Sequence, residues 1–123
     1  MTIIEAIDYI DAIKPNTFTK TEKTKWLSNL EGIIYEEIVR THEGAENVIF
    51  SGYNDETPDD TILIIPAPYD EVYTKYLEAQ IDYFNGETRR FNNTVLVYNA
   101  AYTNARNWYN KTHMPLSKSF KVF

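Results

Sequence analysis

Residues 87–109 read ETRRFNNTVLVYNAAYTNARNWY, and this stretch predicts the longest helix of the chain. Its apolar residues recur at spacings of 4, 3, 4, 3 and 4, which places them on one face of a helix as a heptad-like seam. The seam consists of Phe91, Val95, Tyr98, Tyr102, Ala105 and Tyr109. We expect the helix to begin at about Glu87, after the Asn85-Gly86 break, and to end before Pro115.

Three further helices are predicted before this one. Two Thr-x-x-Glu capping boxes begin at Thr2 and Thr19, and this pattern is typical of the first turn of a helix. Pro15 ends the first helix, and the longer second helix should run to about Gly44. The third helix should follow the rigid segment 66–68 and end at the break that precedes the last helix.

Residues 45–67 interrupt the helical pattern. Two short β-branched runs, at 48–50 and 62–65, flank a polar stretch with Gly52, Asn54 and Pro58, which is typical of a β-hairpin. Residues 116–123 predict an extended C-terminal tail. The expected fold is mainly α: a single domain over residues 1–123, with a bundle of about four helices and a short β-hairpin or strand pair inserted between the second and third.

The composition excludes several classes of protein. The 123 residues contain no Cys, which rules out disulfide scaffolds, Cys-ligated zinc and thiol nucleophiles. No apolar run approaches the roughly 20 residues that span a bilayer, and no basic segment followed by an apolar one opens the chain, so we expect neither a membrane interaction nor an export signal. The four scattered glycines form no phosphate-binding loop.

The net charge of −6 is distributed unevenly. All 18 acidic residues lie at or before Glu87, so residues 1–87 carry −12 and residues 88–123 carry +6. Two interpretations follow. The basic last helix can lie against acidic helices within one protomer, or each subunit can have an acidic side and a basic side that set the register of a head-to-tail assembly.

The candidate catalytic and metal-binding residues form no known chemical motif. His42 and His113 stand near predicted helix ends, where contact with the terminal carbonyls explains them, and neither belongs to a His-x-x-x-His pair. The central loop carries four acids that resemble a cation site but lack the alternating ligands and central glycine of a calcium loop. These acids are Asp55, Glu56, Asp59 and Asp60. We therefore expect no catalytic residue, no metal, no cofactor and no small-molecule substrate.

The chain is rich in aromatic residues, with 10 Tyr, 6 Phe and 2 Trp. Most of them should belong to the core, but Tyr, Trp and Arg also dominate the energetics of protein interfaces. The last helix gathers all three types, and self-association is expected. The candidate interface residues are Arg89, Arg90, Tyr98, Tyr102, Arg106, Trp108 and Tyr109.

Several strings of residues resemble a known family over nearly the whole chain. They are IKPN at 13–16, TEKTKWLSNLE at 21–31, PAPYDEVY at 66–73, EAQIDY at 78–83, NAAY at 99–102 and YNKTHMP at 109–115. In these strings the chain resembles the head-to-tail connector (adaptor) proteins of tailed phages and prophages of Gram-positive hosts. Members of that family are mostly helical and carry a hairpin or loop between their helices. No residue here matches a defined portal-binding motif.

The resemblance implies a structural role without catalysis. A connector of this family forms a ring of identical subunits that docks on the portal protein, extends the DNA channel and supports the next neck or tail component. DNA would be cargo in that channel. The implied location is the neck of the virion, after assembly in the cytoplasm of the host bacterium.

Two other functions remain as alternatives. A small helical regulatory or DNA-binding protein would use the cations of the last helix, Arg89, Arg90, Arg106 and Lys111, although no helix-turn-helix pattern is present. An enzyme would need an unrecognised site around His42 and the acidic loop.

Overall fold

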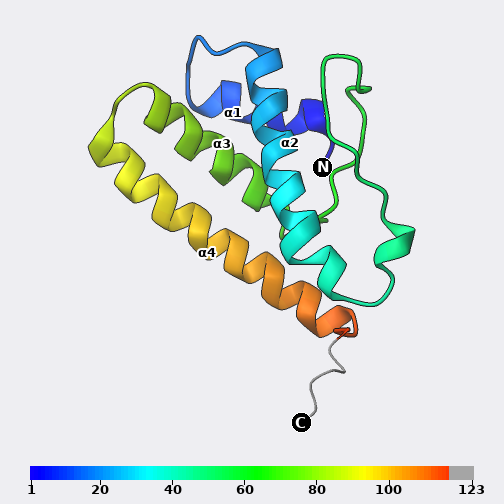
Figure 1. The fold of residues 1–123 in the computed structure, drawn as a ribbon. Helices are drawn as coiled ribbons and strands as arrows, with labels where there is room; N and C mark the ends of the chain where they lie inside the picture. The colour runs from blue at the N-terminus through cyan, green and yellow to red at the C-terminus, as the bar shows by residue number, and fades with distance from the viewer. Residues whose placement is uncertain (117–123) are drawn as a thin grey trace.

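The computed structural model describes residues 1–116, in which four α-helices and two short 3-10 turns make up the regular structure (Figure 1). The elements are α1 (Ile3–Ile13), α2 (Lys20–Glu37), η1 (Val39–Thr41), η2 (Ala45–Asn47), α3 (Glu71–Phe84) and α4 (Thr88–Thr112). The prediction of a mainly helical fold with four helices is confirmed. Within residues 1–116, none of the helices combines the length and the apolar character needed to cross a membrane.

Both predicted capping boxes are present. The Thr2 hydroxyl accepts from the Glu5 backbone N–H at 3.2 Å, and the Glu5 carboxylate accepts from the Thr2 backbone N–H at 2.8 Å. Thr19 and Glu22 make the same pair of bonds at the start of α2, at 3.1 and 2.8 Å. The bond from the capping residue's backbone lowers the pKa of both glutamates. Local sequence therefore determines where α1 and α2 begin.

α2 ends earlier than the sequence predicts. The helix stops at Glu37, a 3-10 turn follows, and Gly44, with a φ of 90°, precedes η2. The Ile38 carbonyl accepts from the Thr41 hydroxyl at 2.8 Å and from the His42 Nδ1 at 2.6 Å. These side chains take the place of the backbone donors that a continuing helix would supply.

α3 lies at the centre of the fold. It packs against α1, α2 and α4, and it runs antiparallel to α4 as a helical hairpin (Figure 1). The buried apolar side chains form one cluster, to which every helix contributes. Its largest fully buried members include Ile3, Ile10, Leu27, Leu30, Ile34, Ile38, Ile65, Tyr73, Leu77 and Ile81.

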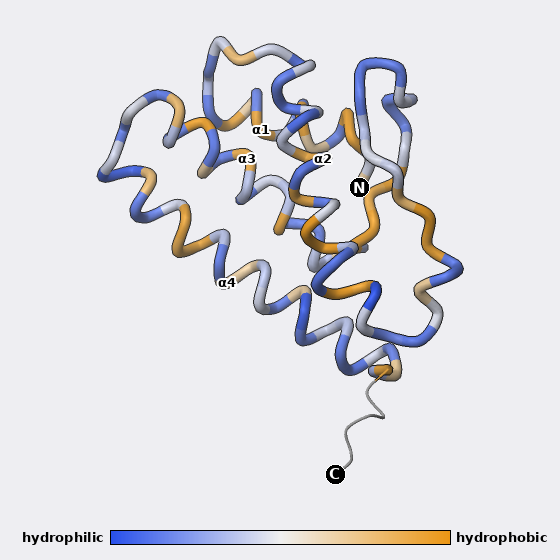
Figure 2. The backbone as a smooth tube through the Cα atoms, viewed as in Figure 1, coloured by the Kyte–Doolittle hydropathy of each residue, from blue (hydrophilic) through white to orange (hydrophobic). Residues whose placement is uncertain are grey.

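α4 lies at one edge of this cluster and is the least buried helix. Only three of its 25 residues are buried, namely Ala101, Ala105 and Tyr109, and it packs chiefly against α3. The seam predicted from the sequence is its inner face, since all of its members are buried or half-buried. Figure 2 shows hydrophobic and hydrophilic residues alternating over the earlier turns of α4, whereas its last turns are hydrophilic to intermediate.

The predicted β-hairpin is wrong. Residues 45–67 contain no strand, and their two apolar runs do not pair with each other. The first run lies along α2 instead: the Phe50 ring is 6.3 Å from the Tyr35 ring, and it sits beside Gly32, where an added Cβ would be 3.7 Å away. Three residues later, the Tyr53 backbone N–H donates to the Ser28 hydroxyl at 2.9 Å. Contacts with a helix thus replace the expected partner strand.

The second run pairs with the N-terminus. Leu63 donates to the Met1 carbonyl at 2.9 Å, and one isolated antiparallel bridge joins Thr2 to Ile62. Its side chains alternate as in a half-buried strand, because Leu63 and Ile65 are buried while Ile62 is 75% exposed. The residues that precede α1 therefore take the backbone groups that a hairpin partner would use.

A buried carboxylate joins this insertion to the helices. Glu31 of α2 is fully buried and accepts from the Tyr73 hydroxyl at 2.6 Å, the Tyr53 hydroxyl at 2.8 Å and the Ile64 backbone N–H at 2.9 Å. The Tyr73 hydroxyl accepts in turn from the Ile65 backbone N–H at 2.9 Å. Burial raises the pKa of Glu31, although the three bonds oppose the shift. Two backbone N–H groups of the second run thus donate to side chains of α2 and α3.

The last described residues return to the end of α2. The Glu43 backbone N–H donates to the Met114 carbonyl at 2.7 Å, and the Leu116 backbone N–H donates to the Thr41 carbonyl at 3.0 Å. Beyond Leu116, the extended tail predicted for residues 116–123 lies outside the described residues.

Candidate functional site

Two of the tyrosines predicted at an interface attach α4 to the rest of the protomer. The Tyr98 ring packs against Tyr76 of α3 with the ring centroids 5.2 Å apart, and the Tyr102 hydroxyl donates to Glu37 of α2 at 2.5 Å. Burial raises the pKa of both Tyr98 and Tyr102, and the bond to Glu37 adds to the shift at Tyr102. Both side chains are half-buried, so only part of each ring is open to a partner.

Trp108 and Tyr109 belong to an aromatic group at the C-terminal end of α4. The Trp108 ring stacks on Tyr69 at 5.4 Å. Tyr109 is 5% exposed, stacks on His113 at 3.7 Å and meets the edge of His42 at 5.0 Å. The ring centroids of His42 and His113 are thus 6.5 Å apart, a proximity that their positions in the sequence did not predict.

His42 is a structural residue in this group. It is 3% exposed, its Nδ1 donates to the Ile38 carbonyl at 2.6 Å, and its Nε2 lies 2.7 Å from the Asn110 Oδ1. Because both ring nitrogens have partners and the ring is closed off from solvent, His42 has no free atom for proton transfer or metal binding. The geometry therefore offers no catalytic base at this position.

The three predicted interface arginines are exposed on α4. Arg90 pairs with Glu87 at 3.3 Å, and the Arg106 guanidinium lies 5.9 Å from the centre of the Tyr102 ring. Arg89 makes no ion pair with any residue of the described range 1–116. Residues 88–116 carry four cations and no acid, so every charged side chain of α4 is basic, two of them in its first turn and two in its C-terminal half.

Among residues 1–116, no segment covers the outer face of α4. Leu96 is 66% exposed and Val97 is 47% exposed, near the middle of the helix. A second stripe of exposed residues runs opposite the inner seam with spacings of three and four. It consists of Arg89, Asn93, Leu96, Ala100, Thr103, Asn107 and Lys111. The face is therefore apolar near its middle and basic at both ends.

An open pocket of about 320 Å³ lies where α3 meets α4. It is lined by Asp82, Tyr83, Gly86, Thr88, Phe91 and Asn92. The Tyr83 and Phe91 rings are 5.3 Å apart, and Tyr83 and the adjacent Phe84 are 58% and 54% exposed. Arg89 and Arg90 follow in the first turn of α4. We call this pocket, with Tyr83, Phe84, Phe91, Arg89 and Arg90, the basic tip.

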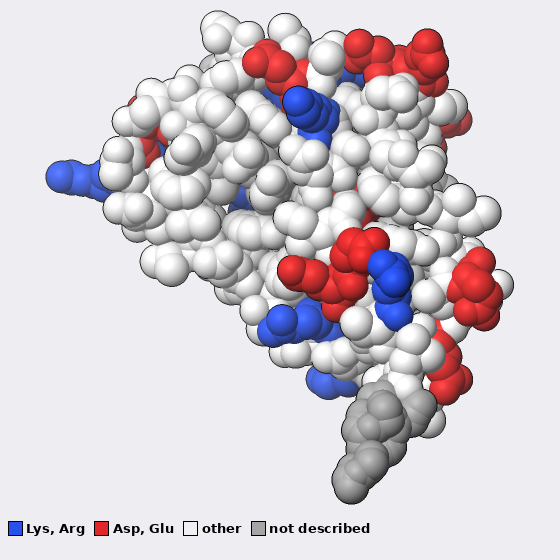
Figure 3. Space-filling model, in the orientation of Figure 1, with Lys and Arg blue, Asp and Glu red and all other residues white. Residues whose placement is uncertain are grey.

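An acidic edge lies on the other side of the molecule. We define it as residues 55–62, whose four acids are exposed together with Ile62. The Thr21 hydroxyl donates to Asp55 at 2.8 Å, and Lys20 pairs with Asp59 at 2.5 Å. Figure 3 shows acidic side chains at the upper end of this insertion. On the opposite side of the molecule, where α3 meets α4, it shows a basic side chain that projects from the surface.

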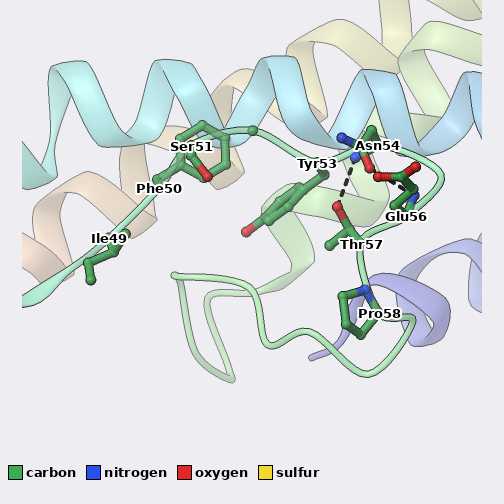
Figure 4. Close-up of a pocket in the computed structure, with 9 residues that line it drawn as sticks. Ile49, Phe50, Ser51, Tyr53, Asn54, Glu56, Thr57 and Pro58 are labelled. Atoms are coloured by element: carbon green, nitrogen blue, oxygen red, sulfur yellow. Dashed lines mark hydrogen bonds between the residues drawn. The ribbon is translucent and has the colours of Figure 1, made fainter.

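The acids of this edge form no metal cage. Within residues 1–116, no group of three or more His, Asp or Glu side chains is arranged to hold a metal ion. A pocket of about 420 Å³ beside the edge is lined by the insertion itself, from Ile49 to Pro58 (Figure 4). Its polar groups bond one another, since the Asn54 backbone donates to the Thr57 hydroxyl at 2.9 Å and the Glu56 backbone to the Asn54 side chain at 2.8 Å. These bonds shape the loop.

Sequence reasoning missed the aromatic part of the basic tip. Phe84 is half-exposed although its ring stacks on Trp26 at 5.5 Å. Neither Phe84 nor Tyr83 was among the candidate interface residues. The available signal was local: an aromatic pair directly before the Asn85-Gly86 break, followed closely by two arginines.

Comparisons of the chain with protein-family models, with curated proteins and with solved structures give no match.

Proposed function

We propose that this chain is a head-to-tail connector of a tailed phage or prophage. In this role it forms a ring of identical subunits that docks on the portal protein, extends the DNA channel and supports attachment of the next neck or tail component. The proposal places it in the neck of the virion, with DNA as cargo and with no catalytic reaction of its own.

One observation carries most of this proposal: a basic tip and an acidic edge lie on opposite sides of one small protomer (Figure 3). A closed ring needs a heterologous interface, in which one patch meets a different patch on the neighbour. Two surfaces of opposite charge provide such a pair of patches, and repulsion disfavours contact between two patches of the same charge. The separation of charge between residues 1–87 and 88–123 supports the same arrangement.

The exposed outer face of α4 also supports assembly. A helix of 25 residues with only three buried is not used fully by the protomer, and its exposed Leu96 and Val97 are apolar side chains available to a partner. A two-fold pairing of this face with its own copy would bring Arg89 of one helix towards Lys111 of the other. Like charges at those ends favour a different partner surface.

The experiment is to determine the size and shape of the purified protein, alone and with the portal protein encoded in the same genome. Mass photometry should detect a discrete oligomer, and electron microscopy should show closed rings, free or seated on the portal. A protein that stays monomeric at high concentration and forms no ring with the portal would contradict the proposal.

DNA binding is the alternative that α4 most directly suggests, because this helix carries four cations and no acid. Its aromatic rings face the protomer, and its cations lie at the two ends of the helix. Tight binding of duplex DNA that weakens steeply with salt would favour this alternative over the connector.

A further inference from the structure

The basic tip has the features of a receptor for an apolar side chain in an acidic setting. Its pocket of about 320 Å³ has a largely apolar lining that includes the rings of Tyr83 and Phe91 together with Asp82, Gly86, Thr88 and Asn92, and Phe84 beside it is half-exposed. Arg89, in the first turn of α4 next to the pocket-lining Thr88, makes no ion pair within residues 1–116. Aromatic rings and arginine around a pocket are the usual composition of an interface hot spot.

The acidic edge supplies a matching knob. Ile62 is 75% exposed, and Asp59 and Asp60 lie just before it in the sequence. The backbone on both sides of it is held by the N-terminus: Ile3 donates to the Thr61 carbonyl at 3.1 Å, and Leu63 donates to the Met1 carbonyl. An exposed isoleucine on a fixed backbone loses little entropy on binding, which makes it suitable as an anchor.

The two features cannot meet within one protomer. The basic tip lies at the end where α3 meets α4, while the insertion lies across the molecule on the far side of α2 (Figure 1). Contact between them therefore needs a second copy, and each copy would offer one knob and one pocket. That is the geometry of a heterologous, repeating interface.

We propose that Ile62 of one copy inserts into the pocket lined by Tyr83, Gly86 and Phe91 of the next copy. Asp60 then faces Arg89, and the contact repeats from subunit to subunit. This inference rests on the proposed ring and adds the contact that builds it.

The absence of cysteine allows a direct test by cross-linking. A double variant with Ile62→Cys and Asn92→Cys puts one thiol on the knob and one at the pocket, because Asn92 lines it. With copper phenanthroline as oxidant, this variant should give a ladder of covalent oligomers, and each single variant should give dimers at most. Ile62→Cys with Asn104→Cys is the matched control, since Asn104 is also exposed on α4 but lies more than three turns from Asn92.

Charge reversal gives an independent test. Arg89→Glu and Asp60→Lys alter groups that make no ion pair within residues 1–116, so folding should be unaffected. Each variant alone should self-associate about tenfold more weakly than the wild type, and an equal mixture should recover the wild-type dissociation constant. Lys111→Glu is the control, because it makes the same change of charge at the other end of α4.

The outcomes separate this contact from the ring itself. If the wild type forms rings but the mixture shows no recovery, or if the Asn104 control gives the ladder instead, the proposed contact is wrong and the ring proposal stands. If neither the wild type nor the cross-linking variants form oligomers, alone or on the portal, both proposals are overturned.

Discussion

At Glu31 a single carboxylate accepts three hydrogen bonds in a place that water does not reach. Burial raises its pKa, so over the range between the ordinary and the raised value the folded protein keeps a proton that the unfolded chain has lost. The contribution of Glu31 to stability is therefore complete below its ordinary pKa. It is lost as the pH rises through the raised pKa of the folded state.

Glu31→Gln should remove this pH dependence, because glutamine keeps the shape of the side chain and does not ionise. As the pH rises from about 4 to about 8, the free energy of unfolding of Glu31→Gln should increase relative to that of the wild type. Urea unfolding at several pH values measures it. Glu5→Gln should shift the other way, because its capping bond lowers the Glu5 pKa and stabilises the fold once the carboxylate is ionised. A difference at Glu31 that does not change with pH would contradict the interpretation.

The two tyrosines that donate hydrogen bonds to Glu31 should contribute differently to the free energy of unfolding. Tyr73→Phe removes one bond to the carboxylate and also leaves the buried Ile65 N–H without an acceptor, so we expect a loss of about 2 to 3 kcal/mol. Tyr53→Phe removes only a bond to the carboxylate, and about 1 kcal/mol is expected. Chemical denaturation of both variants checks the order. Equal losses would show that the Ile65 bond contributes little.

At the scale of elements, the four helices were predictable because their signals are local. The capping boxes at Thr2 and Thr19 and the seam of α4 depend on residues three to seven positions apart. The insertion was not predictable in this way. Its apolar runs have the alternation of strands, but their backbone groups meet the N-terminus, Glu31 and Tyr73, which are distant in the sequence. A short-range sequence pattern cannot predict such distant partners.

The packing of α4 on α3 allows a matched test with one substitution at two positions. Ala105 is fully buried at the α4 inner face, and Ala100 is exposed on the outer face. Ala105→Leu overpacks a closed contact and should cost about 1 to 3 kcal/mol, whereas Ala100→Leu should change stability by less than about 0.5 kcal/mol. The free energy of unfolding in urea measures both. Similar effects at the two positions would mean that α4 does not pack on α3 through this seam.

At the scale of the whole molecule, the candidate site was predicted only in part. Sequence composition indicated that α4 is basic and rich in Tyr, Trp and Arg, and Arg89, Arg90 and Arg106 are exposed as an interface would need. Tyr109 is instead part of the core and Trp108 stacks on Tyr69. Residue type alone does not reveal which face of a helix its own protomer covers, because that depends on tertiary packing.

If oppositely charged sides hold the subunits together, self-association should depend on salt. Between about 0.1 M and about 1 M NaCl the Debye length falls from about 10 Å to about 3 Å, and the dissociation constant of the oligomer should rise about tenfold or more. Arg89→Glu should flatten this dependence, while Lys111→Glu should keep the wild-type slope. Sedimentation velocity in a salt series measures it. Assembly that strengthens with salt would mean that the apolar middle of the α4 outer face, around Leu96 and Val97, makes the contact in place of the charged tip.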